Sequence, residues 1–174
     1  MYYSLDDIET DGLRVPTRFL VDAPQLGFLM PAGTRNEAPD PTVRAGTEVV
    51  LPLWLATPLA AESLSEDSDE PILELLEPAA LRTDVLNVLK SEPLALDLRS
   101  QNRLFTNLAL RWSELFTSDE LARILQETVR VRAASIFDMA LAQQGGEHMD
   151  EYEQRLYAQA AATIRDIRAW QRKN

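Results

Sequence analysis

Cysteine is absent from the 174 residues, which excludes disulfides, thiol nucleophiles and cysteine-ligated zinc or iron–sulfur sites. Histidine is nearly absent too, because His148 is the only one. A single histidine is too few for a multi-histidine zinc site, and a Ser/His/Asp site would have to use it. Glycine-rich nucleotide loops and the HExxH and GxSxG motifs are also missing. The sequence therefore predicts no cofactor and no metal site, and it contains none of these catalytic motifs.

Long hydrophobic runs and clustered basic residues are lacking as well. No apolar run reaches the roughly 18 residues of a membrane-spanning helix, so no membrane partner is expected. Residues 1–7 lack the basic start and apolar stretch of a signal peptide. The chain has 17 basic and 28 acidic residues, a net charge of −11. Phosphate contacts need clustered Lys and Arg, so strong direct binding of nucleic acid by the isolated chain is not expected.

The composition divides the chain into two parts. Residues 1–92 hold 17 acidic and 6 basic residues, whereas residues 93–174 hold 11 of each. Nine of the ten prolines precede residue 80, which is typical of an irregular, strand-and-turn segment. The predicted fold class is mainly α, with a small β-rich N-terminal module at 1–51 and an α-helical bundle domain at 52–174. An acidic loop is expected at about 62–71, within the run 62–77 of seven acids and no base.

Three short strands are predicted in the N-terminal module, at residues 13–21, 27–30 and 47–51. Pro16 would then lie on a sheet edge or at a bulge, because proline donates no backbone hydrogen bond. Pro58 is expected to limit a helix after Pro52 to a short turn, or to kink it.

Four helices are predicted from apolar spacing and proline positions, at about 78–91, 93–116, 117–144 and 147–173. Thr117 and Glu120 have the spacing of a capping box at the start of the third helix, and Gly145-Gly146 would end it. The last helix carries an apolar stripe at spacings of three and four: Met149, Tyr152, Leu156, Ala160, Thr163, Ile167 and Trp170.

The third predicted helix has apolar or small residues around much of its circumference, including Val129, Ala133, Ala134, Phe137 and Leu141. Such a helix must be buried on several sides, either as the centre of a monomeric bundle or by contact with another subunit. The residues predicted to pack in the core or at a subunit interface are Trp54, Trp112, Phe116, Leu121, Leu125, Tyr152, Leu156 and Trp170.

Two alternatives remain open at this point. The first is a small acidic enzyme that uses His148 and carboxylates, although a solvated surface histidine is the simpler interpretation. The second is direct DNA contact through Arg123, Arg130 and Arg132, although three arginines among acids usually form a solvated face.

A family resemblance spans nearly the whole chain. The segments are Tyr2 to Ile8 (YYSLDDI), Pro24 to Gly27 (PQLG), Leu51 to Ala56 (LPLWLA), Pro93 to Leu98 (PLALDL) and Arg168 to Trp170 (RAW). In this order they resemble the PSF-three subunit of the eukaryotic GINS complex, in its fungal form. The chain differs at Gly145-Gly146, where relatives often carry a longer insertion.

The resemblance implies a nuclear, non-catalytic scaffold subunit of a heterotetramer. The four GINS subunits each have an α-helical domain and a small β-domain, and in this subunit the β-domain comes first. Its nearest neighbours would be the PSF-one and PSF-two subunits. GINS joins the MCM ring and a further cell-division-cycle protein in the CMG helicase at the replication fork, where the ATPase activity belongs to MCM. The N-terminal module would face MCM.

Overall fold

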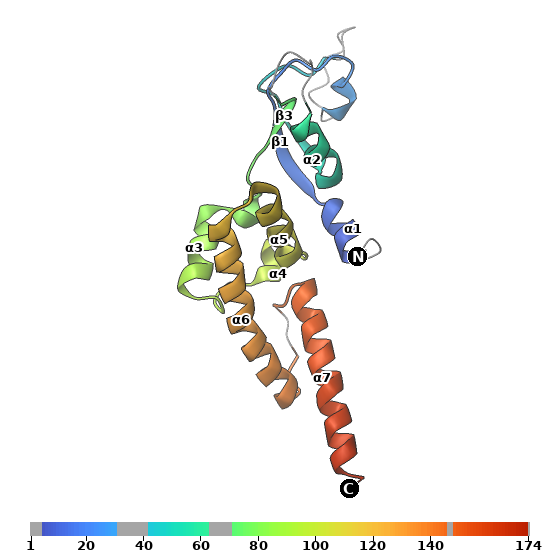
Figure 1. Cartoon of the computed structure of the whole chain (residues 1–174), viewed down its shortest axis with the longest axis vertical. Coiled ribbons are helices and arrows are strands. Elements are labelled where there is room, and N and C mark those ends of the chain that lie inside the picture. The colour runs from blue at the N-terminus through green and yellow to red at the C-terminus, as the bar shows by residue number, and fades with distance from the viewer. Residues whose placement is uncertain (1–4, 31–41, 63–70, 146–147, 174) are drawn as a thin grey trace. The chain divides into compact units, whose positions relative to one another are not determined.

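The chain forms two compact units, Met1–Pro78 and Ala79–Asn174 (Figure 1). The computed structural model describes residues 5–30, 42–62, 71–145 and 148–173. The chain is mainly helical with a small antiparallel sheet in the first unit, which confirms the predicted fold class. Grouped by contacts, the first compact unit extends to Pro78. The domain boundary expected after residue 51 stays a prediction. Most of the predicted acidic loop lies outside the described residues.

The first unit is built on a three-stranded antiparallel sheet in the order β2-β1-β3. The central strand is β1 (Arg14–Phe19), flanked by β2 (Glu48–Pro52) and β3 (Leu73–Leu75). Alternate residues of β1 are buried, which is the period-two pattern of a strand with one face on a core. The strands predicted at 13–21 and 47–51 are therefore confirmed.

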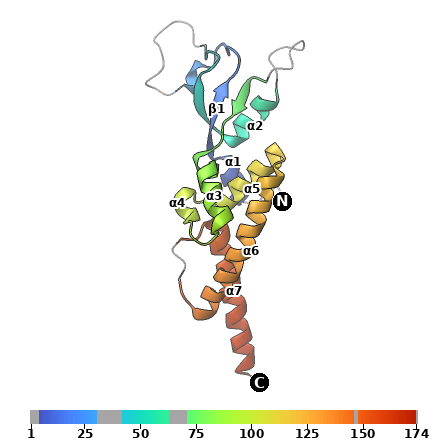
Figure 2. The same cartoon turned by 90° about the vertical axis from the view of Figure 1, so that its left-hand side faces the viewer.

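One face of this sheet is covered by a helix. The helix α2 (Leu53–Ala61) contacts all three strands, and α1 (Leu5–Asp11) contacts α2 (Figure 2). Residues of the three strands, of α2 and of the segment before β2 make one apolar core: Val15, Phe19, Val43, Val49, Leu51, Leu53, Ala56 and Leu73.

Three expectations for this unit are wrong in detail. Residues 27–30 do not form a strand, because Gly27–Leu29 is a 3-10 helix (η1) closed by a hydrogen bond from the Leu29 amide to the Leu26 carbonyl. Of the two outcomes expected for Pro58, the short turn is wrong, since α2 has nine residues and continues past the proline, whereas the kink stays a prediction. Pro16 lies in the central strand rather than at an edge.

The position of Pro16 has a local explanation. Pro16 is opposite Val50 of β2, and on its other side its carbonyl accepts the Leu76 amide at 2.9 Å, just past the end of β3. The missing N–H of the proline therefore lies beyond the last residue of β3, so no hydrogen bond within β3 is lost.

The second unit is a helical bundle. Its longest helices are α6 (Asp119–Ala142) and α7 (Glu151–Gln171), which pack side by side (Figure 1). The shorter elements are η2 (Ala79–Leu81), α3 (Thr83–Ser91), α4 (Leu98–Gln101) and α5 (Phe105–Phe116). The long helix α6 also contacts α5 and α3, so it is the central element of the bundle. None of the helices within the described residues is long and apolar enough to span a membrane.

Helix boundaries in this unit differ from the predicted ones. The helix expected from residue 78 begins at Thr83, after η2. The helix expected at 93–116 is divided, because the Asn102 side chain accepts the Leu104 amide and Asn102 itself is extended. These local side-chain bonds compete with the helical ladder, so α5 starts only at Phe105.

The caps of the two long helices also differ from prediction. Ser118, not Thr117, is the N-cap of α6, and Thr117 is the left-handed residue that ends α5. The end of α6 is formed by Gln143 with φ of 55°, before the glycine pair. The capping box belongs instead to α7, where Asp150 and Glu153 bond each other's backbone amides.

Candidate functional site

A buried ion pair joins α6 and α7. Arg132 of α6 and Glu153 of α7 form a bidentate pair, with Nε donating to Oε1 and Nη2 donating to Oε2 at 2.9 Å. Their side chains are only 9% and 5% exposed. A buried arginine requires such a partner, because an unpaired charge away from water is very costly.

The same guanidinium also binds the loop before α4. Arg132 Nη1 donates to the carbonyl oxygens of Pro93 and Leu96, each at 3.0 Å. The arginine thus fixes three segments that are distant in sequence. Its donors are already engaged by protein oxygens, which makes it a poor site for an external anion.

Asp150 extends this network to α5. Its Oδ1 accepts the Glu153 amide at 2.9 Å, and its Oδ2 accepts the Thr106 amide at 2.8 Å in the first turn of α5. The Asp150 amide in turn donates to Glu153 Oε2 at 3.4 Å. Asp150 is completely buried, so one carboxylate caps two helices inside the bundle.

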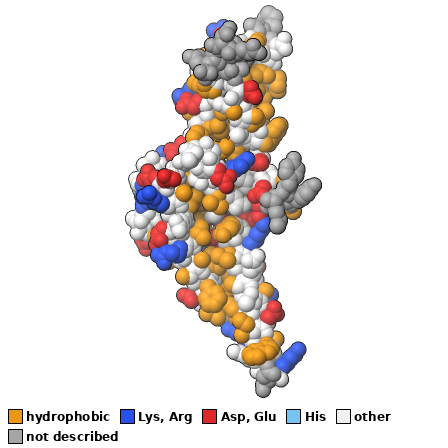
Figure 3. Space-filling model, viewed as in Figure 1, with side chains coloured by type: hydrophobic (Ala, Val, Ile, Leu, Met, Phe, Trp, Pro, Cys, Tyr) orange, Lys and Arg blue, Asp and Glu red, His pale blue; other side chains and the backbone are white. Residues whose placement is uncertain are grey.

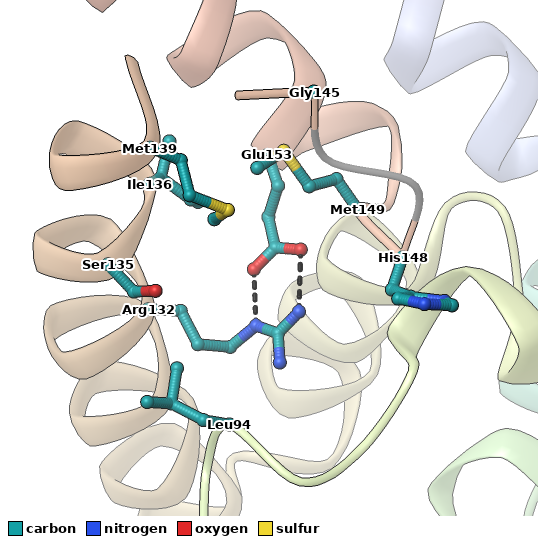
Figure 4. A pocket seen from close by; sticks show the side chains of 9 residues that line it. All are labelled: Leu94, Arg132, Ser135, Ile136, Met139, Gly145, His148, Met149 and Glu153. Atoms are coloured by element: carbon teal, nitrogen blue, oxygen red, sulfur yellow. Dashed lines mark hydrogen bonds and ion pairs between the residues drawn. The ribbon is translucent and has the colours of Figure 1, made fainter. Parts of the chain in front are cut away.

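A cavity of about 240 Å³ lies against the ion pair. Figure 4 shows the Arg132–Glu153 pair in the middle of the lining residues, with side chains of α6 on one side and Met149 and His148 on the other. Apolar side chains supply much of the wall, and His148 lies at the side opposite α6. The lining residues are Leu94, Arg132, Ser135, Ile136, Met139, Gly145, His148, Met149 and Glu153.

His148 forms a surface pair with Asp97. Its Nδ1 lies 2.9 Å from Asp97 Oδ2, and the histidine side chain is 76% exposed. The pKa of Asp97 is lowered, first because its carboxylate accepts the Ser100 amide and second because of His148. The Asp97 carboxylate is thus the N-cap of α4 as well as the partner of the histidine.

The predicted packing residues fall into two groups. Trp112, Leu121 and Leu125 are buried inside the helical unit, and Leu156 is half-buried. The others are exposed within this chain: Trp54 59%, Phe116 48%, Tyr152 40% and Trp170 66%. Whether the exposed group meets a partner stays a prediction.

Other large apolar side chains of the long helices are exposed as well. Phe137 and Leu141 of α6 are 50% and 43% exposed, and Ile167 of α7 is 50% exposed. Figure 3 shows hydrophobic side chains gathered along the part of the molecule formed by these two helices. Single exposed apolar residues are common, but a series along two packed helices is typical of a surface that is covered by another protein.

The stripe predicted on the last helix does not coincide with its buried face. Within α7 the buried residues are Glu153 and Ile164, whereas Tyr152, Ile167 and Trp170 are exposed. The helix therefore turns a polar, ion-paired position toward α6 and keeps part of its apolar stripe on the surface.

The sequence interpretation of Arg132 as part of a solvated face is wrong. The buried positions Thr128, Arg132, Ile136 and Ala140 recur every four residues on α6. This spacing could have indicated that Arg132 is buried, and an arginine on an apolar helical face needs a buried carboxylate as partner. Because Arg132 is buried, it is not available for the DNA contact considered above. Arg130 forms an ion pair with Glu127.

Comparison with known families gives the class of each unit. Residues 80–172 match the GINS complex protein helical bundle domain, and residues 3–61 match the PSF3 N-terminal domain. The second unit is therefore a GINS-type helical bundle, in agreement with its architecture.

Similar curated proteins cover both units. The chain is 37% identical over 178 residues to the DNA replication complex GINS protein PSF3 of Phaeosphaeria nodorum, covering 97% of this chain and 94% of that protein. It is 38% identical over 139 residues to that of Saccharomyces cerevisiae, covering 78% and 69%. For Debaryomyces hansenii the identity is 30% over 175 residues, covering 97% and 96%. The chain belongs to the PSF3 family of GINS proteins, which are proteins of a DNA replication complex.

Proposed function

We propose that this chain is a non-catalytic scaffold subunit of a heterotetrameric GINS complex that acts in DNA replication in the nucleus. Its helical unit packs against the neighbouring GINS subunits, with PSF-one and PSF-two nearest. The complex joins the MCM ring and a further cell-division-cycle protein in the CMG helicase. The chain contributes shape and buried area that hold the helicase in its active arrangement, while ATP hydrolysis belongs to MCM.

The observation that best supports this proposal is the exposed apolar surface of α6 and α7, in a chain of the PSF3 family. Phe137, Leu141 and Ile167 are each at least 43% exposed, although the same helices bury a charged pair between them. Large apolar side chains cost free energy when they contact water, and burial against a second subunit recovers it. An obligate subunit is expected to carry such a surface.

The test is the mass of the particle formed when the chain is co-expressed with the three other GINS subunits of one fungus. The expected result is a particle with one copy of each chain, stable through size-exclusion chromatography and native mass spectrometry. A well-folded monomer that stays separate from those partners would contradict the proposal.

A further inference from the structure

The cavity beside the Arg132–Glu153 pair offers no unpaired charge to an occupant. The only charged or titratable side chains among its lining residues are those of Arg132, Glu153 and His148. Arg132 and Glu153 neutralise each other in their bidentate pair, and His148 lies beside the Asp97 carboxylate. An external ion would find no free counter-charge there, so the cavity favours an uncharged, apolar occupant.

The volume of the cavity limits the size of that occupant. At about 240 Å³ the cavity is smaller than the roughly 300–1,000 Å³ of sites for drug-sized ligands. An apolar cavity of about 150 Å³ already holds one benzene ring, so one large apolar side chain is of the right size here. Leu94 lines the cavity and is 53% exposed, so the cavity can be reached from the surface of the chain.

An uncharged stripe on α7 leads away from the cavity. It begins just before the helix at Met149, which lines the cavity, and continues with Tyr152, Leu156, Ile167 and Trp170. Tyr152, Ile167 and Trp170 are 40%, 50% and 66% exposed. Ile167 belongs to the apolar surface proposed above for assembly, so the cavity is continuous with that surface. A stripe with spacings of three and four, roughly 30 Å long, matches the side of another helix.

We infer that the cavity is the anchor site for one large apolar side chain of an amphipathic helix that belongs to a neighbouring GINS subunit and lies along the α7 stripe. The inference rests on the proposed function, in which the helical unit packs against those subunits, and it specifies the place and the chemistry of one contact. Helices dock through side chains at three- and four-residue spacing, and an anchor in a pocket carries much of the binding energy.

The first test fills the cavity with a side chain of this chain. Ser135 is half-buried on the cavity wall and projects from α6 toward the ion pair in Figure 4, so Ser135→Phe places a ring where the anchor would lie. A tagged variant and the unmodified chain, in equal amounts, compete for limiting quantities of the three other GINS subunits of one fungus. Ser135→Phe should enter the particle at least about tenfold less often than the unmodified chain.

Two control variants enter the same competition. Ser135→Ala keeps the cavity open. Gln126→Phe adds the same ring at an exposed position of α6 that does not line the cavity. Each control should enter the particle within about twofold of the unmodified chain, as expected for a substitution that removes no contact.

The second test identifies the occupant without a substitution that could disturb folding. Photo-methionine, a photoreactive analogue of methionine, is incorporated into this chain alone, and the particle is assembled with three unlabelled subunits. Of the four methionines, Met139 and Met149 line the cavity, whereas Met1 and Met30 belong to the first unit. After illumination, mass spectrometry should find links from Met139 or Met149 to a large apolar residue in a helix of another subunit.

The outcomes separate the inference from the proposed function. If the particle assembles, equal competition by Ser135→Phe would show that the cavity is not an anchor site. Photo-links from Met139 and Met149 that stay within the chain would show that no partner side chain enters it, even if Ser135→Phe is excluded. Links to a charged residue or to a non-helical segment would contradict the stated chemistry. Each of these results overturns the inference alone, whereas an unmodified chain that does not enter the particle contradicts the proposed function itself.

Discussion

Arg132 shows at residue scale how one side chain can organise the helical unit. Its guanidinium binds Glu153 and two backbone carbonyls and is almost fully buried. A buried ion pair adds little net stability compared with apolar residues of the same volume, but removal of one partner is severe. The pair is therefore best understood as a device that fixes the register of α7 against α6.

Glu153→Gln tests this view of the ion pair. The substitution keeps the shape of the side chain but leaves the Arg132 charge buried without its counter-ion. We expect a loss of about 3–5 kcal/mol in the free energy of unfolding, measured by chemical denaturation. Glu127→Gln, which removes one partner of an exposed ion pair within α6, should cost much less. Equal effects of the two substitutions would show that Arg132 is not buried.

Removing a polar group at Thr128 is expected to leave stability unchanged or to raise it, in contrast to Glu153. Its hydroxyl is buried and has no hydrogen-bond partner among the described residues. Thr128→Val keeps the volume and removes an unsatisfied polar group, so stability should be unchanged or rise by about 1 kcal/mol. Thr128→Ala, which also leaves a small void, should be less stable than the valine variant. A large loss of stability in the valine variant would mean that the hydroxyl has a partner.

At the scale of elements, the start of α7 depends on Asp150. The carboxylate caps α7 and also accepts the Thr106 amide at the start of α5. Asp150→Ala should therefore cost more than the roughly 0.5–2 kcal/mol of an ordinary N-cap, because it leaves buried amides unpaired in two helices. Ser118→Ala, which removes the single side-chain bond of the α6 cap, is the comparison. Hydrogen exchange should show faster opening in the first turns of both α5 and α7 for Asp150→Ala only.

The cap of α4 predicts a pH dependence. The pKa of Asp97 is lowered by the Ser100 amide and, to a smaller degree, by His148. A lowered pKa in the folded state means that the contribution to stability is present above the ordinary value and is lost as the pH falls through the folded value. An NMR titration should place the Asp97 midpoint below the usual value of about 3.9, and His148→Ala should raise it only in part. A midpoint at or above the usual value would contradict the cap.

The same His148→Ala variant tests the enzyme alternative. His148 is highly exposed, and its ring nitrogen Nδ1 lies beside the Asp97 carboxylate. We expect the variant to keep assembly and replication function. Loss of a function with assembly intact would favour a chemical role for the histidine and the carboxylates.

The sequence predicted the elements better than their boundaries. Apolar spacing found the helices now seen as α3, α5, α6 and α7, because that spacing reflects burial on a helix face. Apolar spacing did not reveal the break in the helix at Asn102. The capping box was predicted at Thr117, whereas it lies at Asp150. Short polar side chains can bond several nearby amides, and the sequence does not tell which bond forms. It missed β3 because a strand of three residues is defined by its partner and not by its own pattern.

The candidate site was less predictable than the fold. Arg132 and Glu153 are ordinary charged residues in the sequence, 21 residues apart. Their pairing depends on the packing of α7 against α6. In the sequence Asp150 is one of several acids near the start of the last helix, and nothing marks its partner Thr106, which lies 44 residues away. Long-range polar contacts of this kind leave almost no periodic signal.

At the scale of the whole molecule, the chain combines a negatively charged sheet unit with an electrically balanced helical unit that exposes apolar side chains. Neither unit contains, within the described residues, a group of three or more His, Cys, Asp or Glu that could hold a metal ion. Under the proposed function, the exposed apolar side chains of the helical unit serve contacts within the GINS complex.

The most direct test of this assignment is the mass of the co-expressed four-subunit particle when the chain carries Phe137→Asp and Ile167→Asp. Both side chains are 50% exposed, so the isolated fold should keep its helical circular dichroism. The predicted result is a chain that folds but no longer joins the particle. A complete particle with the doubly substituted chain would contradict the central claim that α6 and α7 form the assembly surface.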